Sequence, residues 1–184
     1  DASPAFNPTT IHVSPGTYVE HVNYKGKPVN LRSSEGATNT VIDGGNVDGV
    51  VAFQNGEGSD SILDGFTITN GNEYFGGGVF CSGSTPVIRN NVIVGNYAAL
   101  NGGGIACNGA AAPEIINNTI TDNWAFDGGG GIASQYGSIT VVKNCILWNN
   151  IGTPAEMEIL VDTGILTVEY SDVKGGWPGT GNID

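Results

Sequence analysis

The sequence predicts an all-β fold, a parallel β-helix (solenoid) of about six to seven rungs with a period of about 26 residues. Three observations predict it. Residues of one type recur at that period in four separate columns, the apolar runs are short, and each run alternates with polar residues in the two-residue period of a strand. The runs end at Asn or Gly, which turn a chain through positive φ.

The N-terminal third contains short β-branched and aromatic runs separated by turn residues. Ser14–Gly16 and Tyr24–Gly26 have the composition of turns. The runs between such turns are predicted to be strands, over residues 10–13, 18–19, 29–31, 41–42 and 50–53.

Four columns carry the repeat through the rest of the chain, and their steps stay close to the same period. Because rungs of a β-helix pair about 4.8 Å apart, we expect the members of each column to stack. The same register places Val168 on Val142, and Ile42 ahead of Ile68. The columns are Val79, Ile105, Ile132 and Ile159 after glycine-rich segments; Ile68, Ile93, Ile120 and Ile146; Asn91, Asn118 and Asn144; and Asn96, Asn123 and Asn149.

Composition limits the function classes. The chain has 184 residues, 6 basic and 18 acidic, and a formal net charge of −12. A nucleic-acid partner needs Lys and Arg to neutralise phosphates, and an anionic membrane surface needs the same. No run approaches the ~20 apolar residues of a membrane span. We therefore predict no nucleic-acid partner and no membrane insertion, and an acidic surface suited to solubility outside the cell.

Several segments resemble known β-helix proteins. The stretches 11–20, 25–29 and 31–36 resemble the opening coils of bacterial right-handed β-helix repeat proteins, and pectin methylesterases have a similar opening. The Gly-Gly-Gly-Ile and Ile-x-x-Asn elements resemble the repeats of polymorphic outer-membrane proteins. The closing stretch 168–184 resembles the end of the solenoid in large bacterial surface proteins.

This resemblance implies a right-handed parallel β-helix, in one domain over residues 1–184, at an extracellular or cell-surface location. It implies no single activity, because the superfamily includes lyases, esterases, epimerases and adhesins. The helical N-terminal cap usual in such proteins is absent from the sequence, and we expect the chain to be a segment of a longer protein. No catalytic motif of the pectin methylesterases is present, so no active-site residue is carried over.

Three cysteines, Cys81, Cys107 and Cys145, make no disulfide framework. Cys81 and Cys107 follow Val79 and Ile105 by two residues, so they should stack on adjacent rungs, with Ser134 next. A metal or redox pair is one interpretation. Two buried thiols in a core column is the favoured one, because no nearby spacing supplies further zinc ligands.

Two basic residues are the candidates for polysaccharide-lyase chemistry, which needs a base and cations that neutralise a uronate. They are Arg89, which aligns with Asp64, and Lys143, which aligns with Glu169. The alternative is two inter-rung surface ion pairs. We favour the alternative, because so few basic residues make a uronate cleft hard to build.

Loops before the glycine-rich segments carry aromatic and polar side chains that should share one edge of the rod. Aromatic rings there could stack on sugars while Asn and acids bind hydroxyls. The alternative is that the rings pack on one another and shield the loop backbone. The candidate ligand-binding residues are Glu73, Tyr74, Tyr97, Asn101, Trp124, Phe126 and Asp127, with Phe75 beside them.

Calcium is the one cofactor that the sequence suggests, through carboxylates of Glu73, Asp127, Glu156 or Glu158. No EF-hand or RTX spacing occurs, so no metal ligand set is predicted. His12 and His21 lie in strand-like alternation without a Ser or Cys partner and are predicted to be ordinary surface residues.

Three functions remain open. The favoured one is a non-catalytic extracellular module of a bacterial surface or secreted protein, acting as a spacer or in carbohydrate recognition. The second is a polysaccharide-active enzyme of the lyase or esterase type acting on acidic glycans, supported only by fold analogy. The third is a structural element that associates end to end through exposed strand edges.

Overall fold

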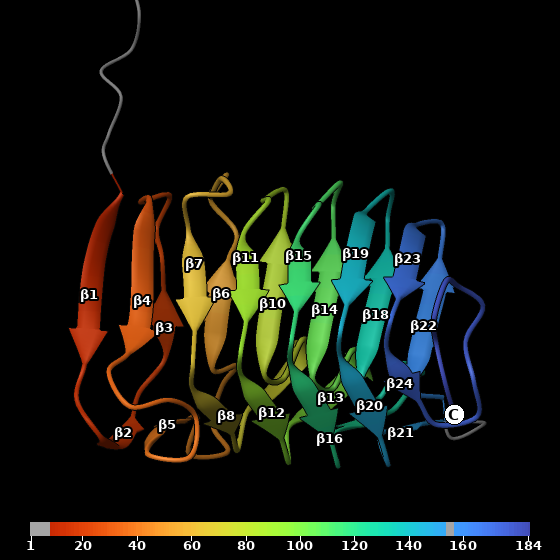
Figure 1. Ribbon diagram of the computed structural model, residues 1–184, viewed down its shortest axis with the longest axis horizontal. Helices are drawn as coiled ribbons and strands as arrows, with labels where there is room; N and C mark the ends of the chain where they lie inside the picture. The colour runs from red at the N-terminus through yellow and green to blue at the C-terminus, as the bar shows by residue number, and fades with distance from the viewer. Residues whose placement is uncertain (1–7, 154–156) are drawn as a thin grey trace, which may run out of the picture.

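The computed structural model describes residues 8–153 and 157–184 and shows a β-solenoid of about six turns (Figure 1). All pairs of named strands are parallel, and neighbouring strands in a sheet come from successive coils. The coils stack along the long axis of the molecule. The all-β solenoid and its period of about 26 residues are therefore confirmed. No helix in the described part of the chain is long and apolar enough to cross a membrane.

Two seven-stranded sheets form adjacent sides of the rod. We name them sheet A and sheet B. Sheet A has the order β1 (Thr9–Val13), β4 (Val29–Ser33), β7 (Ile62–Asp64), β11 (Val87–Arg89), β15 (Glu114–Ile116), β19 (Ile139–Lys143) and β23 (Ile165–Glu169). Sheet B has the order β2 (Gly16–Val19), β5 (Thr40–Asp43), β8 (Thr67–Thr69), β12 (Val92–Val94), β16 (Thr119–Thr121), β20 (Ile146–Trp148) and β24 (Asp172–Val173).

Two further sheets complete the coil, and we name them sheet C and sheet D. Sheet C has the order β3 (Val22–Asn23), β6 (Val51–Phe53), β10 (Val79–Ser82), β14 (Ile105–Asn108), β18 (Ile132–Gln135) and β22 (Ile159–Asp162). Sheet D has the order β9 (Asn72–Phe75), β13 (Tyr97–Asn101), β17 (Trp124–Ala125) and β21 (Ile151–Gly152). The strands expected in the N-terminal third are β1, β2, β4, β5 and β6.

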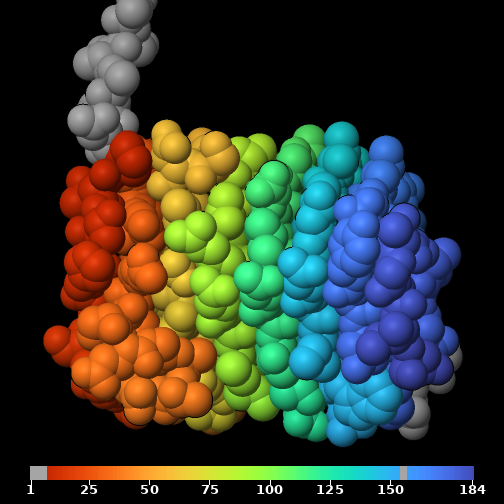
Figure 2. Space-filling view, in the orientation of Figure 1, coloured from red at the N-terminus to blue at the C-terminus, as the bar shows by residue number. Residues whose placement is uncertain are grey.

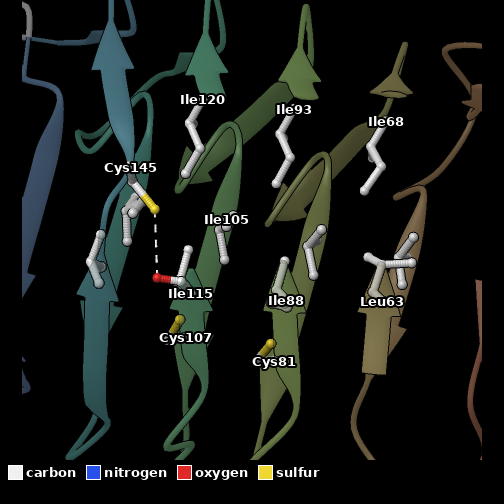
Figure 3. Packing of buried hydrophobic residues seen from close by; sticks show 14 of the residues in the cluster. Leu63, Ile68, Cys81, Ile88, Ile93, Ile105, Cys107, Ile115, Ile120 and Cys145 are labelled. Atoms are coloured by element: carbon white, nitrogen blue, oxygen red, sulfur yellow. Dashed lines mark hydrogen bonds between the residues drawn. The ribbon is translucent and has the colours of Figure 1, made fainter. Parts of the chain in front are cut away.

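The core is a set of stacked columns, one for each inward position of a strand (Figure 3). In sheet B, Ile68 pairs with Ile93 and Ile93 with Ile120, and all three side chains are fully buried. The glycine-preceded column of sheet C is also confirmed in register, from Val79 through Ile105 and Ile132 to Ile159. Each buried aliphatic side chain contributes about 1.5–3 kcal/mol relative to exposure.

Three column assignments were wrong by one residue. Ile120 pairs with Leu147, not with Ile146, whose side chain is exposed. The coil between the paired positions is one residue longer than the expected step, and a slip of one residue turns a side chain to the opposite face. For the same reason Asn144 and Asn149 lie outside the asparagine columns; both are exposed and have positive φ (52° and 59°). Cys145 and Asn150 take the inward positions.

A ladder of buried asparagines joins sheets B and D. The backbone N–H of Asn96 donates to Oδ1 of Asn123 (3.0 Å), and that of Asn123 donates to Oδ1 of Asn150 (3.1 Å). The ladder ends at Glu158, whose carboxylate accepts a hydrogen bond from Nδ2 of Asn150 (2.6 Å). Burial raises the pKa of Glu158 above its ordinary value. Each ladder amide thus satisfies a backbone group that the turn leaves unpaired.

A second ladder joins sheets A and B through Asn91 and Asn118. Cys145 takes the next position, where its Sγ accepts from the N–H of Asn118 (3.4 Å) and donates to the carbonyl of Ile115 (3.5 Å, Figure 3). The N–H of Cys145 in turn donates to Oγ of Ser171 (3.0 Å). A thiol therefore replaces an amide in the ladder, which explains why this column is not all asparagine.

The glycine-rich segments are required by close backbone packing between sheets C and D. A Cβ on Gly77 would collide with the carbonyl of Tyr97, and one on Gly103 with the carbonyl of Trp124. Any larger residue would push sheet D away from the core. The recurrence of glycine before Val79 and Ile105 thus reflects packing space.

Cys81 and Cys107 stack in register, followed by Ser134, as the sequence predicted. Both thiols are free and fully buried, and burial is the main cause that raises the pKa of Cys81 well above its ordinary value. A high pKa keeps the thiol protonated and unreactive. The two cysteines therefore serve as small core side chains.

Candidate functional site

The aromatic candidates lie on one side of the rod. Tyr74, Tyr97 and Trp124 are on strands of sheet D and not on loops as expected, whereas Phe126 follows β17. Tyr97 on β13 pairs with Trp124 on β17, and their rings stack at a centroid distance of 4.8 Å with an interplanar angle of 12°. The ring of Phe126 meets Trp124 edge-on at 6.1 Å. The structure thus forms a continuous aromatic row.

This row uses its own ring faces for packing. Because Tyr97 and Trp124 stack along the rod axis, no sugar ring can lie between them, and mainly their edges face outward. Tyr74, with 66% of its surface exposed, has no aromatic neighbour among the described residues and keeps its ring free. Tyr97 and Trp124 therefore pack on one another, as the alternative expected, while the ring of Tyr74 is available to a ligand.

Two carboxyl groups meet beside Tyr74. Glu73 lies on β9, and Asp48 lies one coil earlier, between β5 and β6. The N–H of Asn72 donates to the carbonyl of Asp48 (3.0 Å). This bond places Asp48 beside Glu73, the next residue along β9. Their side chains are in hydrogen-bond contact. Two carboxylates at that separation repel each other, which favours a state in which the pair shares one proton.

The contact between the two carboxyl groups shifts their pKa values in opposite directions. The hydrogen bond with Glu73 is the main cause that lowers the pKa of Asp48, with help from the N–H of Gly49 (2.8 Å) and the charge of His21. The same carboxyl contact is the main cause that raises the pKa of Glu73, against a hydrogen bond from the N–H of Tyr74 (2.7 Å). When the pair holds one proton, these directions place it on Glu73, with Asp48 as the acceptor.

The carboxyl pair lies between two hollows. One has a volume of about 340 Å³ and is lined by apolar and polar side chains, namely His21, Asp48, Gln54, Glu73, Phe75 and Phe80. The other is a shallow hollow of about 520 Å³, bordered by Val47, Asp48, Asn72, Glu73, Tyr74 and Ala99. A ligand in either hollow would reach the same two carboxyl groups, so we name Asp48, Glu73 and both hollows the carboxyl-pair site.

Asp48 and His21 were not identified from the sequence as site residues. His21 borders the hollow of about 340 Å³, and the His21 Nδ1 lies 2.8 Å from the carbonyl oxygen of Gly49. A signal was present: the column of Val79 extends back to Val51 and Val22, through coils that are longer than the usual period. Extended in this way, it places Asp48 and His21 just before equivalent strands.

Three other candidates lie along the same side but away from the pair. Asn101 is buried at the end of β13, where it pairs with Phe75, and its Oδ1 has no hydrogen-bond partner among the described residues. Phe126 and Asp127 follow β17, two coils beyond Glu73, and both are exposed. The structure therefore gathers Glu73 and Tyr74 around Asp48 and leaves Asp127 outside the hollows.

The lyase candidates lie on sheet A. Nη2 of Arg89 is 3.0 Å from Oδ2 of Asp64, a carboxylate that also accepts from Nδ2 of Asn90 (2.7 Å). Nζ of Lys143 is 3.4 Å from Oε2 of Glu169. Both predicted ion pairs are confirmed. Each of the two cations is held by a carboxylate, and neither borders a hollow of the carboxyl-pair site. Arg89 and Lys143 are therefore members of inter-rung ion pairs.

No group of three or more His, Cys, Asp or Glu side chains that could hold a metal ion is found in residues 8–153 and 157–184. Glu158 is committed to the asparagine ladder, and Glu156 lies outside the described residues. Calcium binding stays a prediction from the sequence.

The separation of the two carboxyl groups limits the chemistry of the site. Glycoside hydrolysis uses two carboxyl groups about 5–5.5 Å apart for retention or about 6.5–9.5 Å apart for inversion. Asp48 and Glu73 lie within hydrogen-bond reach of one another, closer than either of these separations. The pair is arranged to exchange hydrogen bonds with hydroxyl groups.

Comparisons with known proteins agree with this architecture. A family model described as "Right handed beta helix region" matches residues 21–146 and, in a second overlapping match, residues 77–176. A search of curated proteins and a search of solved structures returned no match.

Proposed function

We propose a function from one established premise: the chain belongs to the right-handed β-helix family, whose model covers residues 21 to 176 in two overlapping matches. The family gives the fold, and the function must come from the site. We propose that the chain is a non-catalytic recognition module, located outside the cell or on its surface, that binds a neutral carbohydrate at the carboxyl-pair site.

The contact between the carboxyl groups of Asp48 and Glu73 carries this proposal. A pair that holds one proton offers a donor and several acceptors within a few ångströms, which suits neighbouring hydroxyl groups. Tyr74 borders the shallow hollow and provides an exposed aromatic ring for the apolar face of a sugar. Carboxyl groups that bind hydroxyls beside a free ring match a ligand with both hydroxyl groups and an apolar face, as a sugar has.

Charge supports a neutral ligand. The chain has a net charge of −12, and the hollows contain two carboxyl groups and no Lys or Arg. A uronate would place a third carboxylate in this field, which like-charge repulsion disfavours. Neutral hexose polymers meet no such repulsion.

A panel of neutral and uronate-containing polysaccharides tests the proposal, with calorimetry for binding and a reducing-end and unsaturated-product assay for turnover. We expect binding to a neutral glycan without product. Asp48→Asn should weaken binding about 10–100-fold, since a hydrogen bond to a charged group contributes about 1.5–3 kcal/mol. Tyr74→Ala should also weaken it.

Two matched controls separate the site from the rest of the surface. Asp127→Asn makes the same chemical change as Asp48→Asn on an exposed acid two coils away. Tyr136→Ala removes an exposed aromatic ring from the turn after β18, outside sheet D. Both should leave affinity unchanged. Release of product from any polymer, or equal losses in the control and the site variants, would refute the proposal.

A further inference from the structure

Four Asn-Gly dipeptides occur in the chain, at residues 55–56, 70–71, 101–102 and 108–109. In such a dipeptide the main-chain nitrogen of glycine can attack the side-chain amide carbon of asparagine, because glycine has no Cβ to hinder the approach. The reaction needs an accessible asparagine, a glycine N–H that no acceptor holds, and room for the backbone to move. The fold meets these conditions at one of the four dipeptides and opposes them at the other three.

Asn55 and Gly56 meet all three conditions. Both are exposed in the segment between β6 and β7, which Figures 1 and 2 show at the upper edge of the rod in orange to yellow. Within residues 8–153 and 157–184, no acceptor pairs with the N–H of Gly56. A Cβ built on Gly56 would meet nothing within 4 Å. The side chain of Asn55 is weakly held, by a long hydrogen bond of 3.4 Å from its Nδ2 to Oδ1 of Asn23.

Asn70 and Gly71 are held by hydrogen bonds. Nδ2 of Asn70 donates to Oδ2 of Asp43 (3.0 Å), which fixes the side-chain amide. The N–H of Gly71 donates to Oδ1 of Asn96 (2.9 Å), so the attacking nitrogen belongs to the buried asparagine ladder. A Cβ on Gly71 would collide with the carbonyl of Gly77, which leaves the backbone no room to move.

Asn101 and Asn108 are protected by burial. Their exposed fractions are 8% and 7%. The N–H of Gly102 donates to the carbonyl of Gly128 (3.3 Å), and Asn108 is the last residue of β14, where it pairs with Ser82. Reaction at either asparagine therefore requires local opening of the coil.

We propose that Asn55 is a site of spontaneous deamidation and isoaspartate formation. The nitrogen of Gly56 bonds to Cγ of Asn55 while the Cγ–Nδ2 bond breaks, and the proton of the Gly56 N–H leaves with Nδ2 as ammonia. The product is a five-membered succinimide ring. Water then adds to one of its two carbonyl carbons and breaks the bond from that carbon to the ring nitrogen. Opening at Cγ gives aspartate, and opening at the main-chain carbonyl carbon gives isoaspartate.

The modification alters a contact between two coils. The N–H of Asn55 donates to Oε2 of Glu57, whose Oε1 accepts from the N–H of Gly26 in the preceding coil, both at 2.8 Å. Either product places a new negative charge two residues from the buried carboxylate of Glu57, and like charges repel. Isoaspartate also lengthens the main chain of residue 55 by one carbon. The modified chain should therefore unfold at a lower urea concentration than the fresh chain.

Incubation of the folded chain in warm, mildly alkaline buffer tests the proposal, with trypsin digestion and tandem mass spectrometry at intervals. We expect a gain of about 1 Da at Asn55 in the peptide 33–89, and labelling of that peptide by an isoaspartyl methyltransferase. Asn55 should react at least about tenfold faster than the asparagines of the other three dipeptides, because those need local opening. The urea midpoint of the sample should fall as the modification accumulates.

Incubation in urea gives the reference rates, because unfolding exposes all four dipeptides. Asn55→Gln keeps an amide but would need a larger ring, so it should gain no mass at position 55 and keep its urea midpoint. Asn39→Gln makes the same change in an exposed turn without a following glycine and should age like the wild type. An unmodified Asn55 in the folded chain, while all four dipeptides react in urea, would overturn the proposal. Equal rates at Asn55 and Asn70 in the folded chain would also overturn it.

Discussion

The central coils of the rod repeat the same side-chain contacts from one coil to the next, whereas the N-terminal coils are held by contacts that do not repeat. Between β7 and β20, isoleucine stacks on isoleucine, and Asn96, Asn123 and Asn150 form one hydrogen-bonded ladder. In the N-terminal coils the ladder stops, and single side chains such as Tyr24 and Glu57 take over. The carboxyl-pair site lies where these regions meet. Repetition stabilises the rod, and its interruption creates the hollow that a ligand can use.

Removing one amide of the central ladder should have the largest effect on stability. Asn123→Ala takes away the acceptor of the Asn96 N–H and a donor to the carbonyl of Ile93, all of them buried. We expect a loss of about 3–5 kcal/mol, because each buried group left unpaired costs about 1–3 kcal/mol. Urea unfolding measures it. Asn39→Ala, in an exposed turn, is the control and should change stability by less than about 0.5 kcal/mol.

A buried acid in the N-terminal coils should be the next most costly to remove. Oε1 of Glu57 accepts from the N–H of Gly26, and Oε2 accepts from that of Asn55, both at 2.8 Å. Glu57→Ala leaves both donors unpaired and should cost about 2–4 kcal/mol in urea unfolding. Glu114→Gln, on the exposed face of sheet A, should be silent. A loss equal to that of Asn123→Ala or larger would contradict the view that the central coils hold the rod together.

Changes in the carboxyl pair should alter binding and leave stability almost unchanged. Glu73→Gln keeps a donor toward Asp48 and should retain the fold, while losing part of the affinity for a neutral glycan, about threefold to tenfold. Calorimetry and urea unfolding on one sample separate the two effects. A large loss of stability without a loss of affinity would mean that the carboxyl pair stabilises the fold and does not bind the ligand.

Stability should depend on pH through this pair in a defined direction. The raised pKa of Glu73 means that its stabilising contribution is complete below its ordinary pKa of 4.5 and is lost as pH rises through the raised value. The lowered pKa of Asp48 means that its contribution is complete above 3.8 and is lost as pH falls through the lowered value.

The difference between wild type and Glu73→Gln isolates this effect, which should stay under about 1 kcal/mol because both groups are solvated. Thermal unfolding from pH 4 to pH 7 should show the wild type losing stability relative to the variant as pH rises. A gain relative to the variant would mean that Glu73 is not the protonated member of the pair.

The surface ion pair of the last coils should have the smallest effect. Lys143 and Glu169 are partly exposed, at a nitrogen–oxygen distance of 3.4 Å. Lys143→Ala should cost no more than about 1 kcal/mol in urea unfolding. Loss of a polysaccharide-cleaving activity in this variant would instead revive the lyase hypothesis.

The sequence was sufficient for the fold because equivalent residues recur in the same column. It placed Val79 on Ile105 and Cys81 on Cys107 in the correct register. It failed at Ile146, because coils differ in length by one residue and the similar side chains on either side of the slip hide the difference. Composition alone cannot distinguish an inward Leu147 from its exposed neighbour.

The site was harder to predict for two physical reasons. Asp48 lies 25 residues before Glu73, within one period, but it belongs to no recurring column of the central coils, so the repeat alone did not single it out. The stacking of Tyr97 on Trp124 depends on side-chain rotamers, which a column of aromatic residues does not specify. The residues that were identified, Glu73 and Tyr74, are those that share the period of the central coils.

The most direct test of the central claim is an NMR titration of the isotopically labelled chain with a neutral oligosaccharide. The account predicts chemical-shift changes at Asp48, Glu73 and Tyr74 and at the residues lining the two hollows, with the oligosaccharide recovered intact. Shift changes centred on Arg89 and Lys143 of sheet A, or cleavage of the oligosaccharide, would contradict it.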